Sequence, residues 1–581
     1  MVIFLRLLML TISTIGTWEW IHKKTKINIY FVPSLTIAIQ VVFLFVAGIL
    51  NFLFETVIFL FVFGIISFFY FLYKKDTRGF LSNYLRMGFI YLFSASLIML
   101  IAVRGKHFGH IDNFTHWATV IKVMLRNDRF PNFSDAVIGF PAYPLGSSSY
   151  IYYFSRIVGT SESLQMFAQI YMMLACILPL FIFCKKNRAA VFLIVSVLTN
   201  FFFVYNITVT NLLVDTLLPL AAMCGLLFIY FYGKNVDRWP LFYSCAVYMI
   251  WIIQIKNSGV YFVLMLIFEL FLVQKQHKKV MSLLICSGIP FLSLLLWHKH
   301  FRLVFENAEK SKHAMTITNF SNIFASKSQT DFQEIIDHIS QFLSSWKDIR
   351  LTILLMLLTG VIVFLTRDDR KDYVKMIFIS IIMFVSYQLG MLGMYVFSMT
   401  GEGLYPIVTE RYDKTIMIAI IYLIMAMVIK GISKENTNRY VGSVSAIVVI
   451  VFLFGYMKIS QGEIRLAGKH YDVPPWYLEK RMWIEKHKTD FVMEEDDTYC
   501  ILTKTSDEKN YMGHAAKYIF YTGKVNAEVI TNMDMMDEIT DEFIFIYDEN
   551  NEIIQEWVRN HYPEQVGNTV IRRWDLYPSV N

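Results

Sequence analysis

Long apolar runs, each close to the length that crosses a bilayer, recur along most of this chain. By the criterion of about 20 apolar residues per membrane helix, the pattern predicts about fourteen spans. They cover residues 2–20, 28–49, 52–73, 84–104, 163–183, 189–205, 211–232, 239–255, 258–274, 280–298, 350–366, 373–398, 414–430 and 439–458. The sequence therefore predicts a polytopic α-helical membrane protein whose transmembrane domain occupies residues 1–458.

The pattern changes after residue 458. Residues 459–581 are richer in charge, and short apolar segments typical of strands alternate there with helical patterns. Strands are expected at 499–502, 543–547 and 570–574, and helices at 476–488, 510–521 and 550–561. This arrangement predicts a small C-terminal α/β domain at 459–581.

Composition agrees with a membrane protein. The chain has 581 residues, of which 56% are hydrophobic and only 17% are charged, whereas a soluble domain carries about 25% charged residues. Residues 2–20 lack a basic start and a small-residue cleavage site, so we read them as a retained span and not as a signal peptide. None of the six cysteines forms a CxxC pair, which leaves no zinc or redox motif of that kind.

Basic residues predict which loops face the cytoplasm, because short cytoplasmic loops are enriched in lysine and arginine. The clusters fall in alternate loops, at His22-Lys23-Lys24, Lys74-Lys75, Lys185-Lys186, Lys275 with Lys278-Lys279, Arg367 with Arg370-Lys371, and Lys430 with Lys434. The other loops are then extracytoplasmic, at 105–162, 206–210, 256–258, 299–349 and 399–413, together with the C-terminal domain and the N-terminus. The net charge of +7 is explained by these loops and predicts no nucleic-acid partner.

The first outer loop, 105–162, begins with an acidic residue, Asp112, just after an apolar run. A helix with one apolar face is expected from Phe114, and such a helix lies in the membrane interface. Its apolar positions are Phe114, Trp117, Ala118, Ile121, Met124 and Leu125, and its polar positions are Thr115, His116, Thr119, Lys122 and Arg126. A carboxylate at the membrane boundary is a site hypothesis. The alternative is that Asp112 only caps the helix, and the two interpretations are compatible.

A series of short motifs follows in the same loop. They are Asn127-Asp128-Arg129-Phe130-Pro131, Tyr143-Pro144-Leu145 with residues 150–153, and Gly159-Thr160-Ser161-Glu162. Together with Asp112, their order and spacing over about fifty residues resemble the GT-C superfamily of membrane glycosyltransferases, in particular the branch of protein mannosyltransferases and aminoarabinose transferases. About four spans precede this loop here, more than is usual in that superfamily. Asn113 stands where the family commonly has a second acidic residue, so no cofactor is assigned and a divalent metal is left open.

Three further elements on the outer side continue the resemblance. Asp215 is expected at the start of a span, as a helix-dipole partner or as a group that orients a substrate hydroxyl. Lys256, in a turn between two spans, either snorkels to water or binds a lipid phosphate. Arg411 and Tyr412 are either interfacial anchors or phosphate ligands.

Other polar groups on the outer side complete the expected site. Arg104, with Lys106, His107 and His110, forms a basic collar before Asp112 that suits an anionic lipid headgroup. The second large outer loop, 299–349, contains an amphipathic segment marked by Phe332, Ile335, Ile336, Ile339, Phe342 and Leu343. His298, His300 and His313 do not have the spacing of metal ligands, so no metal site is predicted there.

The resemblance implies a glycosyltransferase that moves a sugar from a polyprenyl-phosphate donor to an extracytoplasmic cell-envelope acceptor, with inversion. Asp112 would be the catalytic base, and Lys256 and Arg411 would stabilise the leaving phosphate. Asp215, Tyr412, His116 and Arg104 are the other expected substrate-binding residues.

Other interpretations of the chain remain open. A Wzy-like polysaccharide polymerase or lipid-linked ligase also has many spans and large outer loops, but its essential residues would be mainly basic. A lipid-linked glycan flippase or other transporter predicts charged residues at mid-membrane and two related halves, and neither is evident. A sensor or scaffold that only binds glycan would not need so many spans.

Overall fold

The computed structural model describes residues 2–74, 82–135, 137–235, 238–274, 280–305, 317–366, 370–398, 406–489, 497–507 and 510–573. Within these ranges, eleven helices are long and apolar enough to cross a membrane, and three shorter apolar helices accompany them. Each of the fourteen predicted spans coincides with one of these helices. The chain is therefore a multi-pass α-helical membrane protein, as the sequence predicted.

The spans and the segments between them have the following bounds. The apolar helices are α1 (Val2–Thr25), η1 with α2 (Ile29–Phe31, Val32–Ile49), α3 (Leu53–Tyr73), α5 (Met87–Ala102), α8 with η3 (Glu162–Ile177, Leu178–Phe183), α9 (Arg188–Tyr205), α10 with η4 (Leu217–Tyr232, Gly233–Asn235), α11 (Trp239–Ile255), α12 (Gly259–Gln274), α13 (Val280–Val304), α16 (Lys347–Leu365), α17 (Arg370–Phe397), α18 (Pro406–Ser433) and α19 (Arg439–Gln461). The helices between spans are η2 (Asn113–Trp117), α6 (Ala118–Asn127), α7 (Gly146–Val158), α14 (Ile317–Ala325) and α15 (Gln329–Ser345).

The described chain divides into two compact units. The first comprises Met1–Lys106, Met124–Asn132 and Ala142–His470, and the second comprises His107–Val123, Phe133–Pro141 and Tyr471–Asn581. The second unit thus joins the start of the first outer loop to the C-terminal region. The last apolar helix, α19, ends at Gln461, and the domain boundary after residue 458 stays a prediction.

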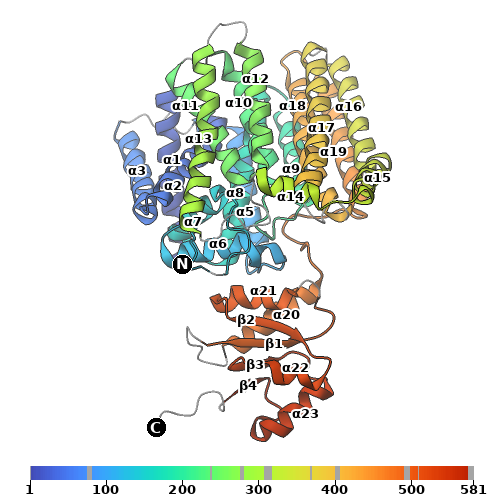
Figure 1. Ribbon diagram of the computed structural model, residues 1–581. Helices are drawn as coiled ribbons and strands as arrows, with labels where there is room; N and C mark the ends of the chain where they lie inside the picture. The colour runs from blue at the N-terminus through green and yellow to red at the C-terminus, as the bar shows by residue number, and fades with distance from the viewer. Residues whose placement is uncertain are drawn as a thin grey trace. The chain divides into compact units, whose positions relative to one another are not determined.

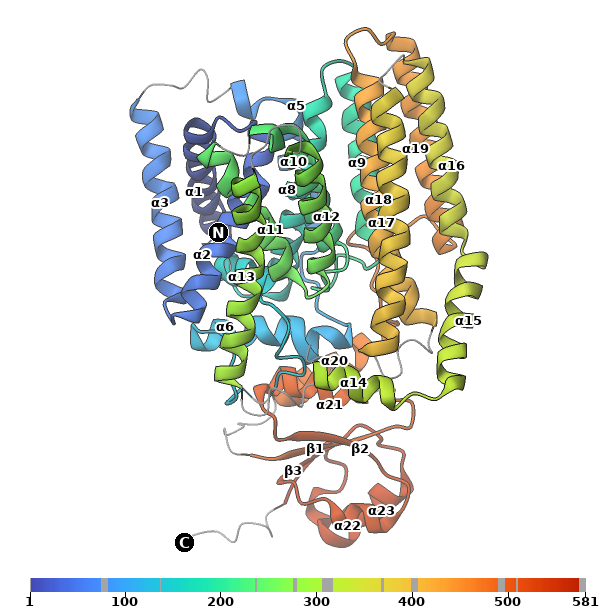
Figure 2. The same ribbon diagram turned by 45° about the horizontal axis from the view of Figure 1, so that its top comes forward.

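The first unit has a buried centre and an apolar outer surface. α10 packs against α8, α11, α12 and α18, and Figures 1 and 2 show α1–α3 on one side of this centre and α16–α19 on the other. The span that includes most of α18 is 89% buried, whereas that of α3 is 22% buried. Exposed apolar side chains on peripheral helices such as α3, α13, α16 and α17 suit contact with lipid tails.

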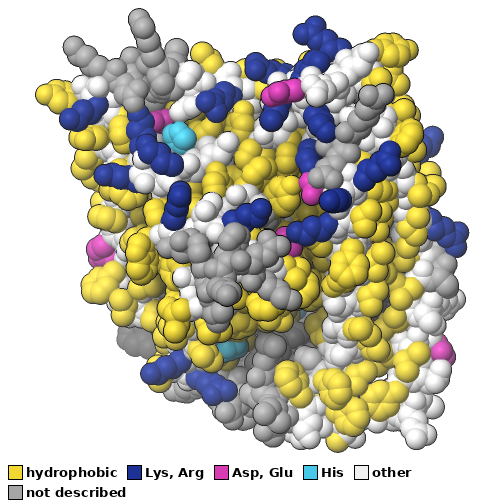
Figure 3. Space-filling model, turned by 90° about the horizontal axis from the view of Figure 1, so that it is seen from above, with side chains coloured by type: hydrophobic (Ala, Val, Ile, Leu, Met, Phe, Trp, Pro, Cys, Tyr) yellow, Lys and Arg dark blue, Asp and Glu magenta, His cyan; other side chains and the backbone are white. Residues whose placement is uncertain are grey.

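The loops with basic clusters lie at one end of the helices. Lys430 of α18 pairs with Asp372 of α17, which also accepts a hydrogen bond from Tyr230 at the end of α10. Lys186 donates hydrogen bonds to the backbone of Glu435 and Thr437. Seen from above, lysine and arginine side chains gather over this face (Figure 3). Lys75, Lys275, Lys278, Lys279 and Arg367 lie outside the described residues.

Described segments of the first unit that are predicted to be extracytoplasmic meet at the opposite end. Asn206, at the end of α9, donates to the backbone oxygen of Arg411 at the start of α18, and Thr210 donates to the backbone oxygen of His470. α10 runs from this end, beside Asp215, to Tyr230 at the basic end. Both sets of loops are thus grouped as the charge pattern predicted.

Two predicted elements begin differently in the structure. The span expected at 211 starts at Leu217, because residues 207–216 form a buried irregular segment before α10. The interface helix does not begin as an α-helix at Phe114, since Asn113–Trp117 form a π-helix before α6. Residues of the predicted polar face, His116 and Thr119, are both only 1% exposed. The expected single apolar face is therefore wrong for the first part of this helix.

The C-terminal region forms a four-stranded sheet in the order β2-β1-β3-β4. β1 (Tyr499–Thr503) pairs in parallel with β2 (Val525–Val529) and β3 (Phe543–Ile546), and β4 (Val570–Arg572) is antiparallel to β3. The helices are α20 (Pro475–Lys488), α21 (Tyr511–Ala516) with η9 (Lys517–Tyr521), α22 (Met533–Glu538) and α23 (Glu552–His561), followed by η10 (Pro563–Gln565). The predicted α/β fold is confirmed, although β2 and α22 were not expected and Trp574 lies outside the described residues.

In the second unit, the start of the first outer loop packs against the C-terminal helices. The ring of Phe114 lies 5.7 Å from that of Tyr511 and 5.3 Å from that of Tyr518. Lys122 donates a hydrogen bond to the backbone oxygen of Tyr518. Arg481 of α20 is 1% exposed and donates to the backbone oxygen of Phe108 at 2.9 Å. These contacts make the π-helix part of the C-terminal unit.

Candidate functional site

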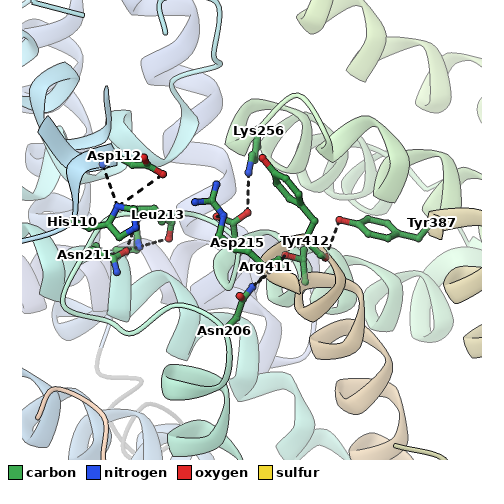
Figure 4. Close-up of polar contacts among 12 residues, drawn as sticks. His110, Asp112, Asn206, Asn211, Leu213, Asp215, Lys256, Tyr387, Arg411 and Tyr412 are labelled. Carbon is green, nitrogen blue, oxygen red and sulfur yellow. Dashed lines mark hydrogen bonds and ion pairs between the residues drawn. The ribbon is translucent and has the colours of Figure 1, made fainter. Parts of the chain in front are cut away.

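A buried ion cluster joins Asp215, Lys256 and Arg411, which come from three separate places in the sequence. Lys256 Nζ lies 2.8 Å from Asp215 Oδ1, and Arg411 Nε lies 3.7 Å from Asp215 Oδ2. The side chains of Asp215 and Lys256 are 3% and 8% exposed, whereas that of Arg411 is 27% exposed. Figure 4 shows Asp215 facing both cations. The structure thus brings together three of the residues that the sequence predicted.

The irregular segment 207–216 positions Asp215. Non-helical backbone in a membrane protein needs internal hydrogen-bond partners where water is excluded. Here Gln169 of α8 donates a hydrogen bond to the backbone oxygen of Leu213 at 3.0 Å. The side chain of Asn211 accepts a hydrogen bond from the backbone N–H of Leu213 at 2.9 Å. Leu218 then donates to the backbone oxygen of Val214, so the chain enters α10 directly after the carboxylate.

The two cations are held by helix ends. Lys256 follows α11 in extended backbone, and the turn closes when Gly259 donates to the backbone oxygen of Lys256 at 2.8 Å. A Cβ on Gly259 would overlap the backbone of α11 at Ile252, so this tight turn requires glycine. Arg411 lies in the second turn of α18, where Asn206 donates to its backbone oxygen at 3.0 Å.

Tyr412 supplies an aromatic face to both cations. Lys256 Nζ lies 4.9 Å from its ring centroid, and the Arg411 guanidinium carbon lies 5.4 Å from it. These are distances at which a ring attracts a cation. The hydroxyl of Tyr387 on α17 donates to the backbone oxygen of Tyr412 at 3.1 Å (Figure 4), which ties α17 to this part of α18.

The charge balance of the cluster is positive. Burial by itself raises the pKa of Asp215, but the charges of Lys256 and Arg411 and the hydrogen bond from Lys256 outweigh burial, and the net pKa is lowered. Asp215 is therefore ionised at neutral pH, so one carboxylate faces two cations. The excess positive charge, carried partly by the more exposed Arg411, suits an anionic ligand.

These contacts bear on two earlier interpretations. Lys256 does not snorkel to water, because its ammonium is buried against Asp215. Asp215 lies one residue before Thr216, which precedes α10, so the helix-dipole interpretation stays compatible with its two ion pairs.

Asp112 lies in the second unit, directly before the π-helix η2. Within the described residues, its side chain makes no capping hydrogen bond with the π-helix that follows, which counts against the cap interpretation. Its backbone N–H donates to His110 Nδ1 at 3.1 Å, and its carboxylate lies 4.0 Å from the same nitrogen (Figure 4). The carboxylate is 30% exposed, so it is accessible to a substrate, and π-helical turns recur at functional sites.

The other two predicted residues differ in exposure. Arg104 is exposed at the end of α5, where it can meet a headgroup. His116 is 1% exposed, and burial lowers the pKa of its ring to about 3, against a smaller opposing effect of Asp112. His116 is therefore neutral at pH 7 and does not add to the positive charge on the outer side.

Metal ligands are not gathered in the part of the chain that the structure describes. No group of three or more histidine, cysteine, aspartate or glutamate side chains in that part could hold a metal ion. His298 and His300 lie on α13, and His313 is outside the described residues.

Sequence reasoning missed Asn206, Gln169 and Tyr387, which hold the ion cluster through bonds to backbone oxygens. Gln169 lies within an apolar run and Asn206 directly follows one, so an amide side chain in or beside a predicted span is the signal that could have pointed to them. Tyr387 lies in the middle of an apolar run, and nothing in the local sequence separates it from the other aromatic residues there.

Comparisons with known proteins show a distant similarity to a solved structure. No family model and no curated protein matches this chain. Among solved structures, the chain is similar to ArnT from Cupriavidus metallidurans in the apo state, with 10% sequence identity and a TM-score of 0.34. The match covers 79% of this chain and 93% of that chain.

Proposed function

We propose that this protein is a membrane glycosyltransferase that moves a sugar from a polyprenyl-phosphate donor to a cell-envelope acceptor on the extracytoplasmic side. The observation that carries the proposal is the cluster of Asp215, Lys256, Arg411 and Tyr412. It provides one excess positive charge, partly exposed, at the end of the helices opposite the basic loops. The order of motifs in the first outer loop, which resembles the GT-C superfamily, supports the same function.

The charge of the cluster suits the leaving group of this reaction. A sugar linked to a polyprenyl phosphate is a phosphodiester with one negative charge, and breaking the bond to the sugar leaves a phosphate monoester whose negative charge is larger. Fixed cations stabilise charge that develops in the transition state. Arg411 can meet two phosphate oxygens with its planar guanidinium, while Lys256 adds a point charge held in place by Asp215.

The acceptor hydroxyl needs a base as it attacks the anomeric carbon, and Asp112 is proposed for that role. Its carboxylate is 30% exposed and makes no capping bond with the following π-helix among the described residues. Direct attack by the acceptor hydroxyl, with a single carboxylate as the base and no covalent sugar intermediate, would invert the anomeric centre. Arg104 and Tyr412 would bind the headgroup and the sugar.

The test is transfer by membranes that contain the full chain, with radiolabelled monosaccharide on polyprenyl phosphate as the donor and isolated cell-envelope glycans as acceptors. Asp112→Asn removes the base with little change in size, so it is expected to lower transfer by about 10²-fold or more. Asp135→Asn, at another carboxylate of the same loop, is the matched control. Full transfer by folded Asp112→Asn protein would exclude Asp112 as the base.

The donor distinguishes this function from its alternatives. A Wzy-like polymerase or ligase would use an oligosaccharide on a lipid diphosphate and would be inactive with the monosaccharide phosphate. A flippase would move the lipid-linked sugar across a vesicle membrane without changing its covalent structure. Product analysis of the same assay, with each donor in turn, separates the three.

A further inference from the structure

A cavity with polar walls lies in the first unit, and it shares no residue with the Asp215 cluster. Its volume is ≈ 850 Å³. Three segments line it: the turn after α2 with the start of α3, the turn that follows α6, and the last part of α13. All three belong to the ends that the charge pattern assigns to the extracytoplasmic side.

The floor of the cavity is rigidly built. Phe130, which is 3% exposed, packs edge-on against Trp297 of α13, and its ring also contacts α2 at Gly48, where a Cβ would overlap it. The indole N–H of Trp297 donates to the backbone oxygen of Ala142 at 3.0 Å. The cavity is therefore fixed by packing and does not depend on a loop closing over it.

An ion pair holds the turn after α6 in an uncommon conformation. Asp128 has a φ of +51°, a region that aspartate tolerates better than most residues. Its carboxylate pairs with Arg156 of α7 and accepts a hydrogen bond from Tyr152. Asp128 is thereby neutralised by Arg156, so it adds little net charge to the cavity.

Two polar side chains of α13, Lys299 and His300, line the same space. Within the described residues, Lys299 makes no ion pair, and its side chain is exposed. His300 also lines the cavity, and its Nε2 atom is buried with no hydrogen-bond partner in the described structure. Arg129 adds a second cation from the turn, against the carboxylate of Glu55, since that of Asp128 is paired with Arg156. Lys299 and Arg129 can only donate hydrogen bonds, and a buried polar atom without a partner is costly, so this arrangement favours a ligand that accepts hydrogen bonds.

The remaining walls are apolar and continue onto lipid-facing surfaces. Phe54 is 42% exposed on α3, and Leu296 and Leu303 are 44% and 75% exposed on α13. In a multi-pass membrane protein such side chains contact lipid tails. The ligand that fits therefore has an anionic head for Lys299 and Arg129 and an apolar tail for these flanking surfaces.

We propose that this cavity binds the phosphate headgroup of an anionic phospholipid from the surrounding outer leaflet. The lipid phosphate would lie between Arg129 and Lys299, with His300 as a further hydrogen-bonding partner and the tails along α3 and α13. Positive side chains near a membrane surface attract anionic lipids in this way. The site does not depend on the transfer reaction proposed above.

The test uses the purified full-length protein in detergent, stripped of lipid, with short-chain phosphatidylglycerol as the probe. Its affinity and its effect on the thermal midpoint are compared with those of phosphatidylcholine of the same chain length and of inorganic phosphate. Phosphatidylglycerol is expected to bind and to raise the midpoint more than either. The double variant Arg129→Gln/Lys299→Gln is expected to weaken its binding by about tenfold or more, equivalent to about 1.4 kcal/mol.

Arg302→Gln is the matched control, because Arg302 is an exposed cation on the same helix that does not line the cavity. It should bind phosphatidylglycerol as the wild type does. Lys299→Arg keeps the charge and should retain binding even if the double variant folds poorly. The proposal is overturned if phosphatidylcholine binds equally well, if inorganic phosphate alone reproduces the effect, or if Arg302→Gln weakens binding as much as Arg129→Gln/Lys299→Gln.

Discussion

Lys256 Nζ lies 2.8 Å from Asp215 Oδ1, and the two side chains are 8% and 3% exposed. A buried ion pair recovers its desolvation cost only while both partners are present. Asp215→Asn is therefore expected to lower the free energy of unfolding by about 3–5 kcal/mol, because it leaves the Lys256 ammonium buried without its carboxylate. Thermal unfolding of the detergent-solubilised protein measures the loss.

The double variant Asp215→Asn/Lys256→Met serves as the control for that loss. Methionine keeps most of the volume of lysine without its charge, so the double variant is expected to be more stable than Asp215→Asn alone. If the two variants unfold at the same temperature, the buried charge of Lys256 is not the source of the instability.

Arg411 is the most exposed member of the cluster, so its substitution is expected to affect transfer more than folding. Arg411→Gln removes a cation from the leaving phosphate and is expected to lower kcat/KM by about 10²-fold or more, by analogy with the loss of one transition-state donor. The kcat/KM of Arg411→Lys should lie between those of Arg411→Gln and the wild type, because lysine keeps the charge but cannot bind two oxygens with a planar group. Initial rates with the polyprenyl-phosphate donor provide the measurement.

The matched control for this series is Arg465→Gln. Arg465 pairs with Glu463 beyond the end of α19 and lies outside the cluster, so its loss is expected to leave the rate unchanged. An equal fall in rate for Arg465→Gln and Arg411→Gln would mean that general surface charge, and not the cluster, controls transfer.

The buried ring of His116 is expected to make the stability of the protein depend on pH. Its pKa is about 3 in the folded protein, because burial disfavours the charged ring, against 6.5 for an unperturbed histidine. Between these values the unfolded chain binds more protons than the folded one, so stability falls as the pH is lowered from 6.5 towards 3. The slope from this residue is about 1.4 kcal/mol per pH unit.

The variant His116→Gln removes this titration and should make stability less dependent on pH between 6.5 and 4. Thermal midpoints measured across that range test it, with His470→Gln, at a partly exposed histidine, as the control. A wild-type slope that persists unchanged in His116→Gln would show that other groups cause it.

The close approach of Phe130 to α2 gives a packing prediction. A Cβ on Gly48 would overlap the Phe130 ring, whereas a Cβ on Gly455 of α19 meets no atom within 4 Å. Gly48→Ala is therefore expected to destabilise the protein by about 1–3 kcal/mol through overpacking, and Gly455→Ala should not. Thermal midpoints of both variants, and of Gly48→Ala/Phe130→Leu, test this: the smaller Leu side chain should recover part of the loss. The explanation fails if Gly455→Ala lowers the thermal midpoint as much as Gly48→Ala does.

The helical part of this fold could be predicted because apolar runs and basic loops are local patterns. The C-terminal strand β2 was missed, since in Val525–Val529 only Val525 is buried and no apolar run marks an edge strand. The π-helix at Asn113–Trp117 was missed because composition does not fix the hydrogen-bond register of a single turn. Asp215, Lys256 and Arg411 could be singled out as charges at span ends, but their ion pairs depend on how three distant segments pack.

The proposed function requires the Asp215 cluster and the C-terminal domain to be extracytoplasmic, and it thereby predicts the orientation of the helices in the membrane. Lysine and arginine side chains gather over the end of the helices that carries the basic loops (Figure 3), and short cytoplasmic loops are rich in these residues. A membrane-impermeant maleimide applied to intact cells should therefore label Lys486→Cys, an exposed position of α20, and should not label Lys24→Cys, an exposed position at the end of α1.

The native cysteines within the described residues are buried except Cys184, which is partly exposed beside the basic cluster Lys185-Lys186, so the unmodified chain gives the background. After the cells are opened, both variants should react, which shows that Lys24→Cys is accessible once the barrier is removed. Labelling of Lys24→Cys but not of Lys486→Cys in intact cells would show that the topology is the inverse of the predicted one. It would also exclude an extracytoplasmic reaction at Asp215, Lys256 and Arg411.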